Sequence, residues 1–166
     1  ALIKSAWIEI GGKKIDRQYG EWLEIWSELT LTNEKQDVYN KMIGKVPQAT
    51  FTATTFTGCM ELYVPLNFWF SRSSGLALPV LALYYHSVEL VVDFREFDEC
   101  WVTNKTEIEP PERPDFEASV LVDYVYLDSD ERKKFYEESH VYLIEQVQST
   151  GCCPVLGSTA NITMCF

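Results

Sequence analysis

Basic residues and histidines are scarce in this chain. The 166 residues contain 14 Lys and Arg against 25 Asp and Glu, for a formal net charge of −11, and the only histidines are His86 and His140. A nucleic-acid-binding surface needs clustered Lys and Arg to displace counterions from phosphates, so no direct contact with DNA or RNA is expected. A zinc site needs paired Cys or His spacings, and none is present, so no metal site is predicted.

Signals for export and for membrane insertion are also missing. Residues 1–10 alternate polar and apolar side chains, whereas a signal peptide has a basic start and an apolar run. The apolar run from Leu76 to Tyr85 is broken by Pro79 and is shorter than the roughly 20 residues that span a bilayer. The sequence therefore predicts a soluble protein without a membrane span, with reduced cysteines and two accidental glycosylation sequons; these residues are Cys59, Cys100, Cys152, Cys153, Cys165, Asn104 and Asn161.

Motifs that carry chemistry are absent as well. The chain has no G-x-S-x-G elbow, phosphate loop, dinucleotide fingerprint or H-E-x-x-H pattern. A glycosidase needs a pair of carboxylates, and four acidic residues in or beside expected strands could supply one, but 25 acidic residues make such coincidences common. We therefore predict no catalytic, cofactor-binding or metal-binding residue, no cofactor and no enzyme activity. The four carboxylates are Glu61, Glu89, Asp93 and Asp123.

What the chain does have is apolar and aromatic surface to bury. Hydrophobic residues make up 46% and aromatic residues 14% of the sequence. This is enough for the core of one domain, and the aromatic content favours β-structure and extensive interfaces.

The N-terminal part predicts a hairpin followed by a helix. Residues 5–10 alternate, Gly11-Gly12 permits a two-residue turn, and residues 13–15 can return as a second strand. Asp16 is placed as the N-cap of an amphipathic helix of three to four turns. Its acidic face has two interpretations, a solvated surface or a binding surface for a cation or basic partner. The apolar side contains Tyr19, Trp22, Leu23, Trp26 and Leu29, and the acidic side Glu21, Glu24 and Glu28.

The stretch from Tyr63 to Phe94 is almost continuously apolar and is typical of the interior of a β-sandwich. We expect a buried strand over residues 79–85 and a half-exposed strand over residues 88–94. The aromatic cluster at residues 68–70 has two interpretations. It packs in the core, or it forms a platform on which Trp69 stacks a sugar, as in a carbohydrate-binding module.

The remaining segments predict loops, one more long strand and a capped helix. Residues 30–57 and 95–116 are expected to be loops, the first with a short helix near residues 38–43. Residues 117–127 alternate as a strand. Asp128 and Glu131 have capping-box spacing for a helix through Phe135. Residues 140–148 suit a strand or an extended connector, and residues 162–166 the start of a strand. The total is about six strands and two helices, fewer strands than a closed jelly roll needs.

Three blocks of this sequence resemble the major capsid proteins of nucleocytoplasmic large DNA viruses, of the iridovirus and algal-virus type. They are IEIGGKKIDRQYGEWLEIWSELT at residues 8–30, PLNFWFSRSSGLALPVLALYYHSVEL at residues 65–90 and VDYVYLDSDERKKFYEESHVYLIEQVQ at residues 122–148. Together they cover nearly half of the chain in the expected order. The chain departs from the family pattern at Ser73-Ser74, where Asn-Pro is expected, and at Ser87, where an acidic residue is expected.

The resemblance implies an all-β fold, a jelly-roll β-sandwich that is part of a double jelly-roll, with short helices in the connections. Residues 1–127 would be the later part of the first jelly roll, residues 128–148 a connector and residues 149–166 the start of the second, so the chain would be part of a longer one. The implied function is a structural subunit of an icosahedral capsid. Its partners would be itself, as a homotrimer of pseudo-hexagonal outline, neighbouring capsomers and minor capsid proteins, and its location the virion after assembly in the host cytoplasm.

Overall fold

A computed structural model describes residues 2–45, 60–100 and 115–151 of the chain. Several predictions concern residues outside these ranges. These are the prolines and the sequon in the second loop, the second sequon, four of the five cysteines and the C-terminal strand, at Pro110, Pro111, Pro114, Asn104, Asn161, Cys59, Cys152, Cys153, Cys165 and residues 162–166.

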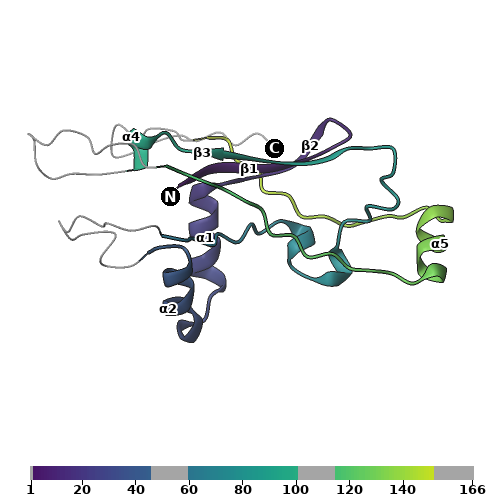
Figure 1. Ribbon diagram of the computed structural model, residues 1–166, viewed down its shortest axis with the longest axis horizontal. Coiled ribbons are helices and arrows are strands. Elements are labelled where there is room, and N and C mark those ends of the chain that lie inside the picture. The colour runs from purple at the N-terminus through teal and green to yellow at the C-terminus, as the bar shows by residue number, and fades with distance from the viewer. Residues whose placement is uncertain (1, 46–59, 101–114, 152–166) are drawn as a thin grey trace, which may run out of the picture.

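The central element is an antiparallel sheet of three strands in the order β2-β1-β3 (Figure 1). β1 spans Ile3–Ile10, β2 spans Lys13–Tyr19 and β3 spans Val88–Phe94. The β1–β2 turn consists of Gly11 and Gly12 with φ angles of 58° and 76°, values that favour glycine. The predicted hairpin and the predicted strand over residues 88–94 are confirmed.

One face of this sheet carries the core. Ala6 and Ile8 on β1 are buried against Phe68 and Trp69, which precede and begin a short 3-10 turn, η1 (Trp69–Ser71). Phe70 stacks on Phe68 with ring centroids 5.3 Å apart. Alternation along β1 explains the arrangement, because every second side chain points to the same face.

The first helix begins later than the sequence predicts. Helix α1 spans Gly20–Thr30, and its N-cap position is Tyr19, which makes no side-chain cap. Asp16 is not the cap: it lies inside β2, opposite Ile8, and is only 3% exposed. The prediction was wrong because β2 continues for four residues beyond Ile15, the last residue of the expected return strand. Helix α2, Asn33–Met42, follows directly and is longer than the short helix expected near residues 38–43.

The segment between the core aromatics and β3 turns repeatedly. After a second 3-10 turn, η2 (Ser74–Leu76), residues 80–85 form consecutive turns with Tyr85 91% exposed. The buried strand expected over residues 79–85 is therefore wrong. Leu83 N–H donates to the carbonyls of Pro79 and Val80, a local pattern that competes with strand pairing. A four-residue helix, α4 (Phe97–Cys100), follows β3.

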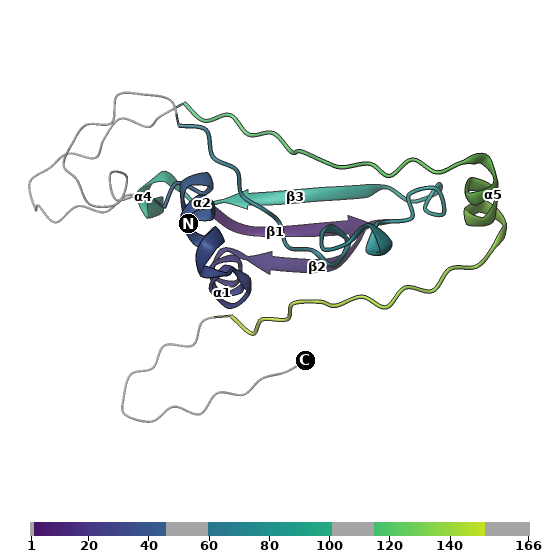
Figure 2. The same cartoon turned by 90° about the horizontal axis from the view of Figure 1, so that it is seen from below.

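Two extended segments are joined by helix α5 (Figure 2). Residues 115–127 and 140–150 are extended but belong to no strand, so the strand predicted over residues 117–127 has no ladder among the described residues. Helix α5 spans Ser129–Glu137, and the Asp128 carboxylate accepts a hydrogen bond from Glu131 N–H at 2.8 Å. The predicted cap of this helix is confirmed. None of the described helices is long and apolar enough to cross a bilayer.

Candidate interaction surfaces

Potential catalytic groups are scattered over the described parts of the chain. No three His, Cys, Asp or Glu side chains among these residues gather in a way that could hold a metal ion. The Glu61 carboxylate accepts a hydrogen bond from the Tyr63 hydroxyl, whereas Glu89 and Asp93 lie exposed on β3. His86 lies beside the Gly11 turn, and His140 stacks on Phe135 at the end of α5. Glu89 lies opposite Glu9 in the β1–β3 ladder, and no ion pair joins either histidine to a carboxylate among the described residues.

The aromatic cluster at residues 68–70 is a core element. Trp69 is 5% exposed, Phe68 is buried, and Phe70 contacts both rings. A sugar-stacking platform needs an exposed ring face, which Trp69 does not offer. The core interpretation is correct and the carbohydrate-binding interpretation has no support.

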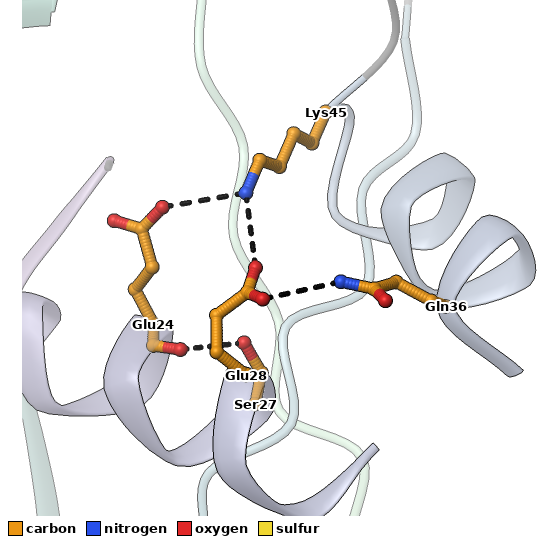
Figure 3. A network of polar contacts seen from close by, with 5 residues as sticks. All are labelled: Glu24, Ser27, Glu28, Gln36 and Lys45. Atoms are coloured by element: carbon orange, nitrogen blue, oxygen red, sulfur yellow. Dashed lines mark hydrogen bonds and ion pairs between the residues drawn. The ribbon is translucent and has the colours of Figure 1, made fainter. Parts of the chain in front are cut away.

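The acidic face of α1 is occupied by cations of the chain itself. Lys45, just beyond α2, places its Nζ 3.4 Å from one carboxylate oxygen of Glu24 and 3.4 Å from one of Glu28 (Figure 3). Gln36 Nε2 donates to the second oxygen of Glu28 at 3.2 Å. Burial opposes the Lys45 charge, but the hydrogen bonds to both carboxylates outweigh it and raise the pKa of Lys45. This network fastens α2 and its C-terminal end to α1.

Glu21, at the start of α1, pairs with Arg95 just after β3. The pKa of Glu21 is lowered, mainly by a hydrogen bond to its own backbone; burial opposes this shift, and the hydrogen bond and charge of Arg95 add to it. Each of the three carboxylates on this face thus has a basic partner within the chain, so the structure favours the solvated interpretation over a site for an external cation.

Residues 144–147 connect the last described segment of the chain to its N-terminal part. Ile144 packs against the core, Glu145 pairs with Arg72, and Val147 N–H donates to the buried Asp16 carboxylate at 3.0 Å. The Arg72 guanidinium also lies over the Trp26 ring, 4.7 Å from its centroid. Sequence reasoning missed this contact. The sequence feature that could have indicated this contact is Asp16, an acidic residue within the alternating stretch that follows the hairpin turn.

The largest exposed apolar surface lies on the extended segments. Side chains from both faces of residues 116–126 are exposed, with Leu121 at 80%, and so are most of those at residues 141–143. Exposed apolar surface of this extent marks an interaction site. An extended segment that is apolar on both faces is typical of a strand buried on both sides. The exposed residues are Phe116, Val120, Leu121, Val122, Tyr124, Val125, Tyr126, Val141, Tyr142 and Leu143.

Comparisons with known proteins give one consistent result. The family described as "Major capsid protein N-terminus" matches residues 1–128. The chain is 39% identical over 189 aligned residues to the major capsid protein of Phaeocystis pouchetii virus, covering 96% of this chain and 36% of that protein. It is 35% identical to the major capsid protein of Paramecium bursaria Chlorella virus 1, covering 90% of this chain and 33% of that protein.

A solved structure gives the same answer at the level of the fold. A chain of the quasi-atomic capsid structure of the chlorella virus PBCV-1 superposes with a TM-score of 0.62 at 29% identity, over 89% of this chain and 34% of that one. The chain spans about a third of the length of these relatives.

Proposed function

The chain belongs to the major capsid protein family of the nucleocytoplasmic large DNA viruses, and from this premise we propose that it is a structural subunit of an icosahedral capsid, active through self-assembly. Its fold class is that of the jelly-roll capsid chain it superposes on. The matched relatives are named as capsid proteins and not as enzymes. This agrees with the prediction from the sequence that the chain has no catalytic residue.

The observation that carries the proposal is the two-sided apolar surface of residues 116–126. A chain that acts on a small molecule concentrates polar groups in a concave pocket. This one instead presents an extended, apolar segment, residues 116–126, whose backbone groups make no hydrogen bonds to the backbone of other described residues. Such segments are suited to burial against other β-strands, as in an assembled shell.

We further propose the following division of the chain. Residues 1–127 form the later part of a first jelly roll, residues 128–148 a connector and residues 149–166 the start of a second jelly roll. The end of the family match at residue 128 and the start of α5 at Ser129 support the first boundary.

The proposed partners are further copies of the same subunit, in trimers of pseudo-hexagonal outline, together with neighbouring capsomers and minor capsid proteins. The proposed location is the virion, after assembly in the host cytoplasm. The net charge of −11 is unfavourable for direct contact with the genome.

The test is the native mass of the product of the complete coding sequence that contains residues 1–166, measured by light scattering after size exclusion. We expect a trimer that persists on dilution. A monomer at all concentrations would contradict the proposal.

A further inference from the structure

Two polar side chains lie on the core side of strand β2, beside apolar residues of the neighbouring strand. We propose that Asp16 and Gln18, here named the polar pair, are positioning residues that determine how two distant main-chain segments pack against β2. They contribute the specificity of this packing and not the stability of the sheet. The inference concerns contacts within the chain and does not depend on the proposed function.

The first argument is the place of the polar pair in the sheet. Asp16 lies opposite Ile8 and Gln18 opposite Ala6, and residues directly opposite in an antiparallel ladder share a face. The residues of β3 in the same two rows are Leu90 and Val92. Gln18 is 1% and Asp16 3% exposed. The polar pair is thus buried beside apolar neighbours, where a polar group without a hydrogen bond is unfavourable.

The second argument is that each member of the polar pair bonds to the main chain of a distant segment. Gln18 Nε2 donates to the Asn67 carbonyl at 2.6 Å. Asp16 Oδ1 accepts a hydrogen bond from Val147 N–H at 3.0 Å. These partners lie 49 and 131 residues later in the chain. Because the amide nitrogen can only donate and the carboxylate oxygen accepts, the polar pair requires a carbonyl at one point and an N–H at the other.

The third argument is that the apolar contacts of the same two segments are less selective. Phe68, which follows Asn67, and Ile144, on the segment of Val147, both pack in the core. Hydrophobic burial is non-directional, whereas a hydrogen bond weakens steeply when its angle departs from linearity. The apolar side chains therefore hold the segments against the sheet, and the polar pair determines which main-chain groups face β2.

The energetic effect of the polar pair differs between the sheet and the segments. Burial of a carboxylate or an amide opposes folding, so an apolar replacement on β2 should not weaken the hairpin. The main-chain group that loses its partner, however, is left unsatisfied in the interior, which is unfavourable until it reaches water. The loss should therefore loosen one segment and leave the sheet folded.

The experiment uses the product of the complete coding sequence that contains residues 1–166. It measures hydrogen exchange by mass spectrometry together with the melting temperature. Asp16→Val removes the acceptor and Gln18→Met removes the donor, and each variant is the control for the other because their partners lie on different segments. Asp16→Asn keeps an acceptor oxygen in the same shape, and Ile8→Val trims an apolar neighbour in the same row.

We expect Asp16→Val to speed exchange in residues 144–147 about tenfold, the effect of losing one hydrogen bond, and to leave residues 66–71 unchanged. Gln18→Met should show the reverse, with exchange in residues 66–71 about threefold faster. Neither variant should lower the melting temperature or the protection of residues 3–19. Asp16→Asn should exchange like the wild type at residues 144–147. Ile8→Val should lower the melting temperature without a preference for either segment.

Three kinds of result would overturn the proposal. The first is a variant of the polar pair that speeds exchange in both segments equally or in neither. The second is failure to fold, a lower melting temperature or faster exchange across residues 3–19 in Asp16→Val or Gln18→Met, because the polar pair would then be an ordinary stabilising part of the core. The third is exchange in Asp16→Asn as fast as in Asp16→Val, because the hydrogen bond would then not be the cause.

Discussion

The guanidinium of Arg72 lies over the ring of Trp26, 4.7 Å from its centroid, and pairs at the same time with the Glu145 carboxylate. One side chain thereby joins helix α1, the turn after η1 and residues 144–147. Cation–π contacts contribute about 0.5–1 kcal/mol at exposed sites, and exposed ion pairs about 0–1 kcal/mol.

Replacing Arg72 should therefore loosen the attachment of residues 144–147. We expect Arg72→Ala to speed amide exchange in residues 144–147 about tenfold, since the two contacts together correspond to roughly 1.4 kcal/mol. The control is Arg132→Ala on α5, an exposed arginine without an ion pair to other described residues. Equal exchange in the Arg72 variant and the wild type would show that residues 144–147 are held by other contacts.

The hairpin turn offers a comparison between adjacent glycines. A Cβ at Gly11 would lie 2.8 Å from His86 Nδ1, whereas a Cβ at Gly12 would meet nothing within 4 Å. Both have positive φ, so alanine at either position costs about 1–2 kcal/mol in backbone strain. We expect Gly11→Ala to cost more than Gly12→Ala, as measured from the opening free energies of the hairpin amides by native-state exchange.

A double variant isolates the contact between Gly11 and His86. Adding His86→Ala should recover the excess cost of Gly11→Ala, with a coupling of about 0.5–3 kcal/mol, and leave the cost of Gly12→Ala unchanged. Additive effects of Gly11→Ala and His86→Ala would mean that the imidazole moves away freely.

Glu21 should make the attachment of α1 dependent on pH. Its pKa is lowered below the ordinary value of 4.5 by the backbone hydrogen bond and by Arg95. A carboxylate with a lower pKa in the folded chain stabilises it above the unfolded pKa, and this stabilisation is lost as the pH falls through the folded pKa.

We therefore expect Glu21→Gln to be less stable than the wild type above pH 4.5, with the difference shrinking below that pH. Urea unfolding followed by the fluorescence of the α1 tryptophans measures it. Glu34→Gln on α2, which removes a carboxylate without an ion pair to the described residues, is the control. A difference independent of pH would contradict the assigned role of the charge.

The apolar extended segment should bind hydrophobic dyes. The isolated 166-residue chain is expected to bind 1-anilinonaphthalene-8-sulfonate and to self-associate, because residues 116–126 expose apolar side chains on both faces. Leu121→Ser with Tyr126→Ser should lower both signals. Val38→Ser on α2, where the valine is 68% exposed on a helix without buried residues, should lower neither. A sharp thermal melt from a soluble monomer that binds no dye would contradict this expectation.

The sequence correctly predicted those elements that are determined by residues close together along the chain. The glycine pair fixed the hairpin turn, the alternation at residues 88–94 indicated β3, and the Asp128–Glu131 spacing indicated the cap of α5. In each case the residues that define the element lie within a few positions of one another.

The predictions were wrong where contacts between distant segments determine the local structure. Asp16 has the residue type of an N-cap, but it lies within strand β2. Its carboxylate accepts a hydrogen bond from the N–H of Val147, 131 residues later. Residues 117–127 alternate like a strand, yet a strand needs a neighbour, and alternation does not specify one. The turn at residues 79–85 is as apolar as a core strand, and its exposure could not be read from hydrophobicity.

The most direct test of the central claim is electron microscopy of the product of the complete coding sequence, purified and imaged in negative stain. We expect particles with three-fold class averages and a hexagonal outline, as for a trimeric capsomer. Monomeric particles without three-fold averages, at concentrations where light scattering is also measured, would contradict it.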